Sequence, residues 1–189
     1  MYDFLVIHGS YGSPYKNWFP WLHGALARRN KTCLNPHFPT PEGQDYETWS
    51  KLLKFYVDEG FVGENTTIIT HSMSCVFVAR FCVEHNMKIK KFVSVSGFNE
   101  IDFSATDFND IYNSFYASKG ELAKFKELCP ERLAFYSDND PYVPLDKGEE
   151  FADIIGAEHL FKKGYGHFNL ENKDMDFTKF REILGVLGE

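Results

Sequence analysis

Three residue types that act together in nucleophilic catalysis occur far apart in this 189-residue chain. Ser72 lies in IITHSMSCVF (68–77), between two apolar runs, Asp140 lies in FYSDNDPYVP (135–144), and His167 lies in KKGYGHFNL (162–170). A histidine can remove the proton of a serine hydroxyl, and a carboxylate can hold the imidazole in the required tautomer. Together the three residues predict acyl transfer through a covalent acyl intermediate on Ser72.

Each of these residues also has an ordinary structural interpretation. Serine is a favoured helix N-cap, and Thr70 and Ser74 occupy the positions where a G-x-S-x-G elbow has glycine. Aspartate is common in turns, so Asp140 could be a turn residue, and Asp138 is a rival acid two residues earlier. His167 could equally be a packing or surface residue, as most isolated histidines are. We prefer Asp140 because the prolines at 141 and 144 fix the backbone beside it, which suits a carboxylate that orients an imidazole.

The spacing of apolar residues predicts the elements that must position these side chains. Strand-like runs cover 3–8, 32–37, 66–70, 90–96, 132–137 and 158–163, and helical runs cover 18–29, 46–59, 73–86, 121–128, 146–155 and 176–187. Strands that alternate with helices predict a mostly parallel six-stranded sheet in a three-layer α/β/α sandwich. Ser72, Asp140 and His167 follow the third, fifth and sixth strand runs. Because reactive groups lie at the carboxyl ends of such strands, we expect the three side chains to meet at one edge of the sheet.

The first helical run contains a proline that its boundaries must accommodate. We expect Asn17 to be the N-cap of this helix, which places Pro20 in the first turn. A proline in the first turn removes only an N–H that has no intrahelical partner, so the helix is preserved.

Two backbone amides are candidates for stabilising a developing oxyanion. The Met73 N–H lies at the N-terminus of the helix that follows Ser72, where the helix dipole favours negative charge. The HGSYGSP segment (8–14) follows the first strand, and its flexible glycines could turn the Ser10 N–H toward the same point. An HG dipeptide on its own is equally consistent with an ordinary turn.

An aromatic segment at about 98–120 follows the fourth strand run. It contains Phe98, Phe103, Phe108, Tyr112, Phe115 and Tyr116. One interpretation is a short lid-like wall in which Phe98, Phe108 and Phe115 bind small apolar acyl groups. The alternative is a helix packed on the sheet as part of the core, and the sequence favours neither.

Composition excludes several classes of partner. Hydrophobic residues make up 43% of the chain and charged residues 25%, as in ordinary globular proteins. The net charge of −7 and the scattered lysines and arginines argue against nucleic acid. No apolar run approaches the roughly 20 residues that span a bilayer, and the N-terminus does not resemble a signal peptide. The four cysteines, Cys33, Cys75, Cys82 and Cys129, form no C-x-x-C pair, so we expect them to be reduced in a cytoplasmic protein. We expect no cofactor.

Five segments carry a resemblance to a known family: HGSYGSPYKNWFPWL (8–22), THSMSC (70–75), VSGF (95–98), DPYVP (140–144) and GYGHF (164–168). In these the chain resembles the small serine hydrolases related to the bacterial YdeN protein and to retinoblastoma-binding protein nine. The resemblance implies one α/β-hydrolase domain over 1–189, with its sheet reduced to six parallel strands, and a Ser72–His167–Asp140 triad. With this triad we expect a carboxylesterase-like enzyme acting on small acyl esters. The L-x-C-x-E signature of retinoblastoma binding is absent, since the chain reads ELCPE with Glu127 in place of leucine, and protein partners stay unassigned.

Two other functions are compatible with parts of the sequence. His8, His37 and His71 could end neighbouring strands and form a zinc set, although no H-x-H or H-E-x-x-H spacing occurs. An interaction protein with little or no catalysis could also retain the same fold, since a fold does not determine a function. An intact triad argues against this second alternative.

Overall fold

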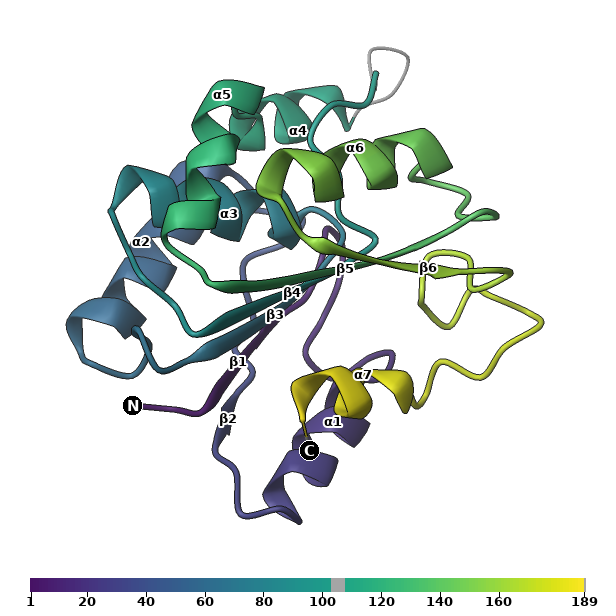
Figure 1. Cartoon of the computed structure of the whole chain (residues 1–189), viewed down its shortest axis with the longest axis horizontal. Coiled ribbons are helices and arrows are strands. Elements are labelled where there is room, and N and C mark those ends of the chain that lie inside the picture. Colours follow the sequence, from purple (N-terminus) through teal and green to yellow (C-terminus); the bar gives the residue numbers. More distant parts are fainter. Residues whose placement is uncertain (103–107, 189) are drawn as a thin grey trace.

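Six parallel strands form the central layer of the computed structural model, which describes residues 1–102 and 108–188 (Figure 1). Their order in the sheet is β2-β1-β3-β4-β5-β6, so β3 lies in the middle and its carboxyl end is flanked by those of β1 and β4. All neighbouring pairs are parallel, which confirms the expected sheet. The strands are β1 (Phe4–Ile7), β2 (Cys33–Leu34), β3 (Thr67–His71), β4 (Lys91–Val95), β5 (Glu131–Ser137) and β6 (Glu158–Lys162).

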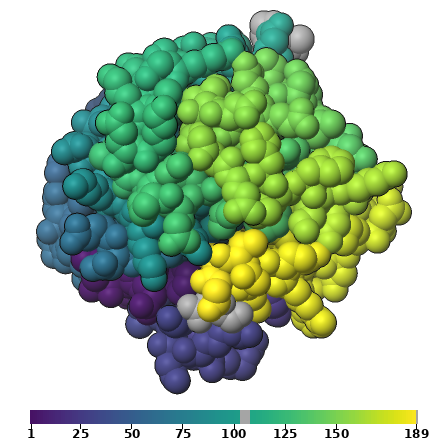
Figure 2. All heavy atoms as spheres, in the orientation of Figure 1, coloured from purple at the N-terminus to yellow at the C-terminus, as the bar shows by residue number. Residues whose placement is uncertain are grey.

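Helices cover both faces of the sheet and complete the three layers of an α/β-hydrolase fold (Figure 1). One face carries α2 (Tyr46–Asp58), α3 (Ser74–Glu84), α4 (Asn109–Phe115), α5 (Lys119–Leu122), the 3₁₀ helix η1 (Ala123–Glu127) and α6 (Leu145–Ile155). The opposite face carries α1 (Phe19–Ala27) and α7 (Glu182–Leu187). In the space-filling view α7, in yellow, lies beside the N-terminal segments drawn in purple (Figure 2). None of the helices in the described ranges has both the length and the apolar character needed to cross a bilayer.

The strand sequences explain this layered packing. Successive strand side chains point to opposite faces of a sheet. In β1, Leu5 and Ile7 join the hydrophobic cluster under α2 to α6, and Phe4 and Val6 join the cluster under α1 and α7. A strand covered on both faces therefore needs an uninterrupted apolar run, as FLVI provides.

The start of α1 differs from the expectation at one residue. Trp18, and not Asn17, is the N-cap, and no side-chain hydrogen bond caps this helix. Asn17 has a left-handed backbone (φ 53°), and its Oδ1 accepts a hydrogen bond from the Leu170 N–H at 3.2 Å. Pro20 does lie in the first turn, as predicted. The asparagine thus connects the α1 entry to the loop that follows β6.

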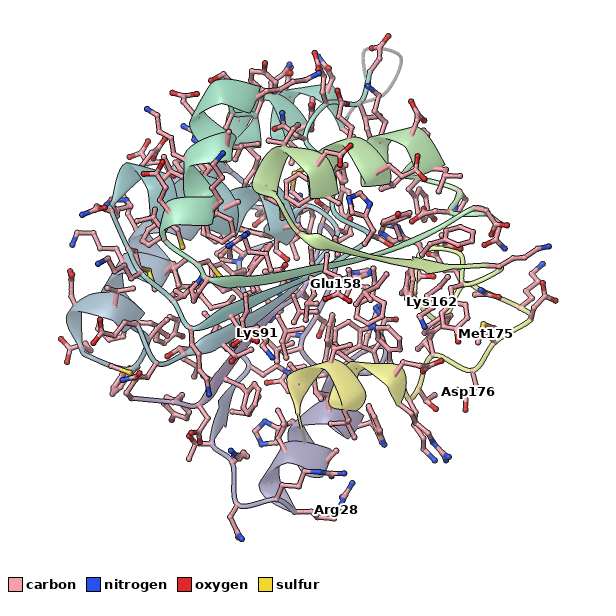
Figure 3. All side chains as sticks on the ribbon, in the orientation of Figure 1. Arg28, Lys91, Glu158, Lys162, Met175 and Asp176 are labelled. Carbon is pink, nitrogen blue, oxygen red and sulfur yellow. The ribbon has the colours of Figure 1, made fainter. Side chains whose placement is uncertain are left out.

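The labelled side chains in Figure 3 mark the two ends of the sheet. Lys91 and Glu158 are the first residues of β4 and β6, and Lys162 is the last residue of β6. Met175 and Asp176 lie on the long segment that returns from β6 to α7. The loop with His167 therefore starts at the carboxyl end of β6. Ser72 follows the carboxyl end of β3, so both lie at the same end of the parallel sheet.

Candidate active site

Ser72 occupies a sharp turn between β3 and α3. Its φ of 60° lies in the left-handed region, which is uncommon for residues other than glycine and is found at strained functional positions. The Ser72 N–H donates to the Val95 carbonyl at 2.8 Å, and the Ser72 carbonyl accepts from the Cys75 N–H at 2.9 Å. These two bonds connect the turn to β4 and to the first turn of α3. A side chain in this position projects beyond the end of the strand, as a nucleophile elbow requires.

Gly9 makes room for this turn. A Cβ atom at position 9 would lie 2.7 Å from Ser72 Cβ and 2.9 Å from the His71 carbonyl oxygen. Both contacts are too close for any side chain. The close approach of the loop after β1 to the elbow therefore depends on glycine at this position.

The two residues that replace the usual elbow glycines are both hydrogen-bonded. Ser74 Oγ accepts from the His71 N–H at 2.9 Å and lies 3.0 Å from the Ile7 carbonyl oxygen. Thr70 Oγ1 donates to the Val93 carbonyl at 3.1 Å. Both side chains are fully buried, so their polar atoms need these partners. The hydroxyl groups hold the turn together instead of obstructing it.

His167 and Asp140 form a buried hydrogen-bonded pair. His167 Nδ1 lies 2.8 Å from Asp140 Oδ2 and 3.0 Å from Oδ1. Asp140 Oδ1 also accepts from the backbone amides of Tyr142 and Val143 at 2.9 and 3.0 Å. Burial by itself raises the pKa of Asp140, but the bond to His167, its charge and the two amides together lower the pKa below the ordinary value. Asp140 is therefore an ionised carboxylate that can orient the imidazole, with Nδ1 as the donor and Nε2 as the remaining nitrogen.

Asp138, the rival acid, has a different partner. Its Oδ1 accepts a hydrogen bond from the Gly164 N–H at 2.7 Å. The side chains of Ser137 and Asn139 likewise accept from the amides of Tyr165 and Gly166, at 2.9 and 2.7 Å. The side chains of residues 137–139 thus connect the end of β5 to the loop that carries His167. Sequence reasoning missed this role, although three successive side chains that accept hydrogen bonds before Asp140 were a visible signal.

Ser72 and His167 line the same cavity, whose volume is about 680 Å³. Within the described chain no hydrogen bond joins Ser72 Oγ to His167, and such catalytic bonds often form fully only when substrate is bound. The other lining residues are Gly9, Ser10, Tyr11, Gly12, Lys16 and Asn17 from the loop after β1, Phe19 from α1, His71 from β3, Phe98 and Phe108 from the segment after β4, Tyr142 from the loop after β5, and Asn169, Leu170 and Glu171 from the segment after β6. The structure thus brings the predicted nucleophile and base to one site.

The two predicted oxyanion donors flank the elbow. Met73 immediately precedes the first residue of α3, and Ser10 lines the cavity in the loop after β1. Neither amide donates a hydrogen bond to another group in the described part of the chain. Ser10 Oγ accepts from Nε2 of the buried Gln44 at 2.7 Å, and the Tyr11 N–H donates to Thr40 Oγ1 at 2.8 Å, so the loop is held in place from the far side.

The three aromatic residues proposed as an acyl wall have separate locations. Phe98 and Phe108 line the cavity. Phe115 does not: it is fully buried in α4, with its ring 5.0 Å from that of Trp49 and 6.0 Å from that of Phe77. Its assignment to the substrate wall was wrong because α4 turns this side chain toward α2 and α3. Phe103 lies outside the described residues.

The three histidines of the zinc hypothesis do not form a metal site. His8 Nδ1 lies 2.8 Å from the Gly9 carbonyl oxygen, and His8 Nε2 accepts from the Phe38 N–H at 3.0 Å, so both ring nitrogens have protein partners. His71 Nε2 lies 2.8 Å from the His167 carbonyl oxygen. Among the residues that the structure describes, no group of three histidine, cysteine or acidic side chains is arranged to hold a metal ion. The zinc alternative therefore finds no support at His8 and His71.

Comparisons with known proteins agree with this geometry. The model of the serine hydrolase family matches residues 4–188. The chain belongs to the serine hydrolase family. It is 28% identical to YdeN of Bacillus subtilis over 96% of this chain and 92% of YdeN, and 26% identical to serine hydrolase RBBP9 of Rattus norvegicus over 90% and 84%. The crystal structure of the B. subtilis ydeN gene product superimposes with a TM-score of 0.83 over 100% of this chain and 97% of that one, at 25% identity. The resemblance inferred from the motifs is thereby confirmed, and the chain is a hydrolase.

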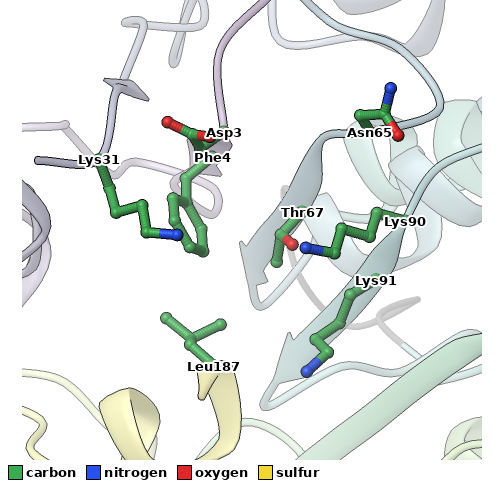
Figure 4. A pocket seen from close by; sticks show the side chains of 8 residues that line it. All are labelled: Asp3, Phe4, Lys31, Asn65, Thr67, Lys90, Lys91 and Leu187. Atoms are coloured by element: carbon green, nitrogen blue, oxygen red, sulfur yellow. The ribbon is translucent and has the colours of Figure 1, made fainter. Parts of the chain in front are cut away.

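A second and much smaller cavity of this serine hydrolase lies at the other end of the sheet. Its volume is about 40 Å³, and Lys31, Lys90 and Lys91 surround it (Figure 4). Phe4 and Thr67, which also line it, are the first residues of β1 and β3. Because Ser72 follows the opposite end of β3, this basic cavity is separate from the candidate active site.

Proposed function

We propose that this serine hydrolase cleaves small acyl esters through an acyl-enzyme on Ser72, as a carboxylic ester hydrolase. One observation carries the proposal: Ser72 at its strained elbow and His167, whose ring is bound by the buried Asp140 carboxylate, line one cavity. A strained serine beside a histidine whose second nitrogen is held by a carboxylate is the arrangement that nucleophilic catalysis needs.

The geometry supports the following reaction. His167 Nε2 takes the proton of Ser72 as its Oγ attacks the carbonyl carbon, and the new oxyanion is bound by the Ser10 and Met73 amides. The protonated imidazole then donates its proton to the leaving alkoxide, which departs as an alcohol. Water enters, gives its proton to Nε2 and attacks the acyl carbon, and Ser72 recovers its proton as the acid is released. Asp140 stays ionised throughout and stabilises the imidazolium.

The lining of the cavity supports an apolar acyl group. Phe98 is almost fully buried, Phe108 is partly buried, and the ring of Tyr11 lies 6.2 Å from that of Phe108. These three residues make one side of the cavity aromatic. Burying apolar acyl carbons there is favourable by about 25 cal/mol per Å² of apolar surface removed from water.

Labelling with a fluorophosphonate probe tests the proposal without knowledge of the natural substrate. The wild-type protein should form a covalent adduct that peptide mass spectrometry places on Ser72, and the Ser72→Ala variant should form none and lose ester hydrolysis. Ser118→Ala is a matched control, because Ser118 caps α5 and does not line the cavity, so this variant should still be labelled. A folded wild-type protein that forms no adduct would contradict the proposal and favour a non-catalytic interaction protein.

A further inference from the structure

We propose that His71, the residue before the nucleophile, is a positioning residue that holds the catalytic base His167 through the backbone of its loop. The inference rests on the proposed function and adds a role for a side chain outside the triad. Its basis is a buried hydrogen bond: His71 Nε2 lies 2.8 Å from the His167 carbonyl oxygen.

The loop that carries His167 needs external support. Gly164, Gly166 and Phe168 all have positive φ angles, of 78°, 55° and 50°, so the loop has no regular structure of its own. On the side of β5, successive amides are held by the side chains of residues 137–139. Those bonds end at Gly166. The carbonyl groups of His167 and Phe168 face the other side of the site, where they need different partners.

His71 and Trp18 are those partners. Trp18 Nε1 donates to the Phe168 carbonyl at 3.0 Å, and His71 Nε2 is hydrogen-bonded to the His167 carbonyl at 2.8 Å. Because a carbonyl oxygen only accepts, the proton of His71 must be on Nε2. The rings of His71 and His167 also touch, with centroids 4.8 Å apart and planes inclined at 62°. The side chain that precedes the nucleophile in sequence therefore contacts both the ring and the backbone of the base.

Burial keeps His71 suited to this role. The side chain is enclosed by Trp18 and Phe19, with ring centroids at 6.3 and 6.0 Å, and is 5% exposed. This burial, with the neighbouring His167, lowers the pKa of His71 to about 3. At neutral pH His71 is uncharged, so it does not oppose the positive charge that His167 acquires during the reaction. A histidine here supplies a donor without a competing charge.

Substitutions that keep or remove the donor separate positioning from packing. A glutamine amide reaches the place of a histidine Nε2, whereas the asparagine amide ends one bond earlier and leucine has no donor. We expect His71→Leu and His71→Asn to slow labelling of Ser72 by a fluorophosphonate, and to lower kcat for an ester, roughly 10- to 100-fold, with KM within about threefold. His71→Gln should recover both to within about fivefold of wild type. If the leucine variant fails to fold, the difference in labelling rate between His71→Gln and His71→Asn still tests the positioning role.

Trp49→Phe is the matched control, because it removes a buried indole hydrogen bond, to the Pro39 carbonyl, in the hydrophobic cluster on the face of the sheet opposite to Trp18. It should lower the melting temperature at least as much as His71→Gln does but slow labelling less than fivefold. Equal labelling rates for the Gln and Asn variants, or a loss confined to KM, would overturn the positioning role. A wild-type protein that is not labelled at all would instead overturn the proposed function, and the inference with it.

Discussion

At the scale of single residues, the candidate site combines local strain with dense hydrogen bonding. A left-handed backbone at serine costs on the order of 1–3 kcal/mol. At Ser72 two backbone hydrogen bonds, to the Val95 carbonyl and from the Cys75 N–H, stabilise this conformation. The buried hydroxyls of Thr70 and Ser74 add bonds from the residues on either side. The elbow therefore tolerates serine and threonine in place of glycine because their oxygen atoms take part in the support.

Asp140→Asn is the residue-scale prediction. The Asn Oδ1 can still accept from the Tyr142 and Val143 amides, so we expect the melting temperature to change by no more than a few degrees. The Asn NH₂ group, however, is a donor, and it would favour the tautomer in which His167 Nε2 carries the proton and cannot act as a base. Steady-state kinetics on an ester should show kcat reduced roughly 10³- to 10⁴-fold.

Asp138→Asn provides the comparison for this variant. Its Oδ1 can keep the bond to the Gly164 N–H, and its side chain does not contact His167. We expect this variant to retain kcat within about fivefold of wild type. A larger loss of kcat in Asp138→Asn than in Asp140→Asn would mean that the acid is wrongly assigned.

At the scale of elements, the loops after β3, β5 and β6 meet because a parallel sheet brings the carboxyl ends of its strands to one edge. Side-chain hydrogen bonds also join these segments to each other. Side chains of 137–139 bind amides of 164–166, and His71 and Trp18 bind the next two carbonyl groups. The position of the base is therefore determined by contacts between loops, which no single element contains.

The segment after β4 gives an element-scale prediction, because two of its phenylalanines have different surroundings. Phe108 lines the cavity, and Phe115 is buried between Trp49 and Phe77. Phe115→Ala should lower the free energy of unfolding by about 3–5 kcal/mol, as measured by urea denaturation. Phe108→Ala should cost far less stability and should change the ratio of kcat/KM between short and long acyl esters. An unchanged ratio would exclude Phe108 from the acyl-binding wall.

The sequence predicted these elements well where the pattern was strong and less well where tertiary contacts decide. Runs with continuous apolar residues became β1, β3, β4 and β5, and the order of Ser72, Asp140 and His167 along them placed the site. The last predicted helix, 176–187, is helical only over Glu182–Leu187, although Phe177 and Phe180 are buried as its spacing implied. β2 is reduced to two residues. For the segment at about 98–120, the sequence could not distinguish a lid-like wall from a packed helix, and α4 lies in this segment. Burial thus follows from composition, but backbone form at the ends of elements depends on neighbours far away in sequence.

Loop contacts were the least predictable part of the site. Asn17 looked like an N-cap from its position, yet its side chain accepts from Leu170, 153 residues later. His71 was a candidate ligand only in the zinc alternative, and its partner is a carbonyl 96 residues away. Residue type indicated a polar role in both cases, but only the folded loops determine which atom is the partner.

At the scale of the whole molecule, burial of neutral histidines links the site to the stability of the fold. Burial is the main cause that lowers the pKa of His71 to about 3, and it also lowers the pKa of His8. In the unfolded chain both imidazoles have an ordinary pKa near 6.5. Below that pH the unfolded state binds protons that the folded state excludes, so stability must fall as the pH decreases from about 6.5 toward 3. Asp140, whose folded pKa is lowered, acts in the same direction only at more acidic pH: its contribution is present above its ordinary value and is lost as the pH falls through the folded value.

Urea denaturation at pH 7.5 and pH 5.0 measures this linkage. Keeping His71 neutral should cost about 1.4 kcal/mol per pH unit below 6.5, or about 2 kcal/mol at pH 5.0. His71→Gln removes one such group and keeps the donor to the His167 carbonyl, so its loss of stability between the two pH values should be about 2 kcal/mol smaller than that of wild type. His23→Gln is the control, because the His23 side chain is exposed to water, and the pH dependence of this variant should match wild type. If His71→Gln and wild type lost the same free energy, His71 would have to take up a proton in the folded protein near pH 6, which its enclosure by Trp18, Phe19 and His167 opposes.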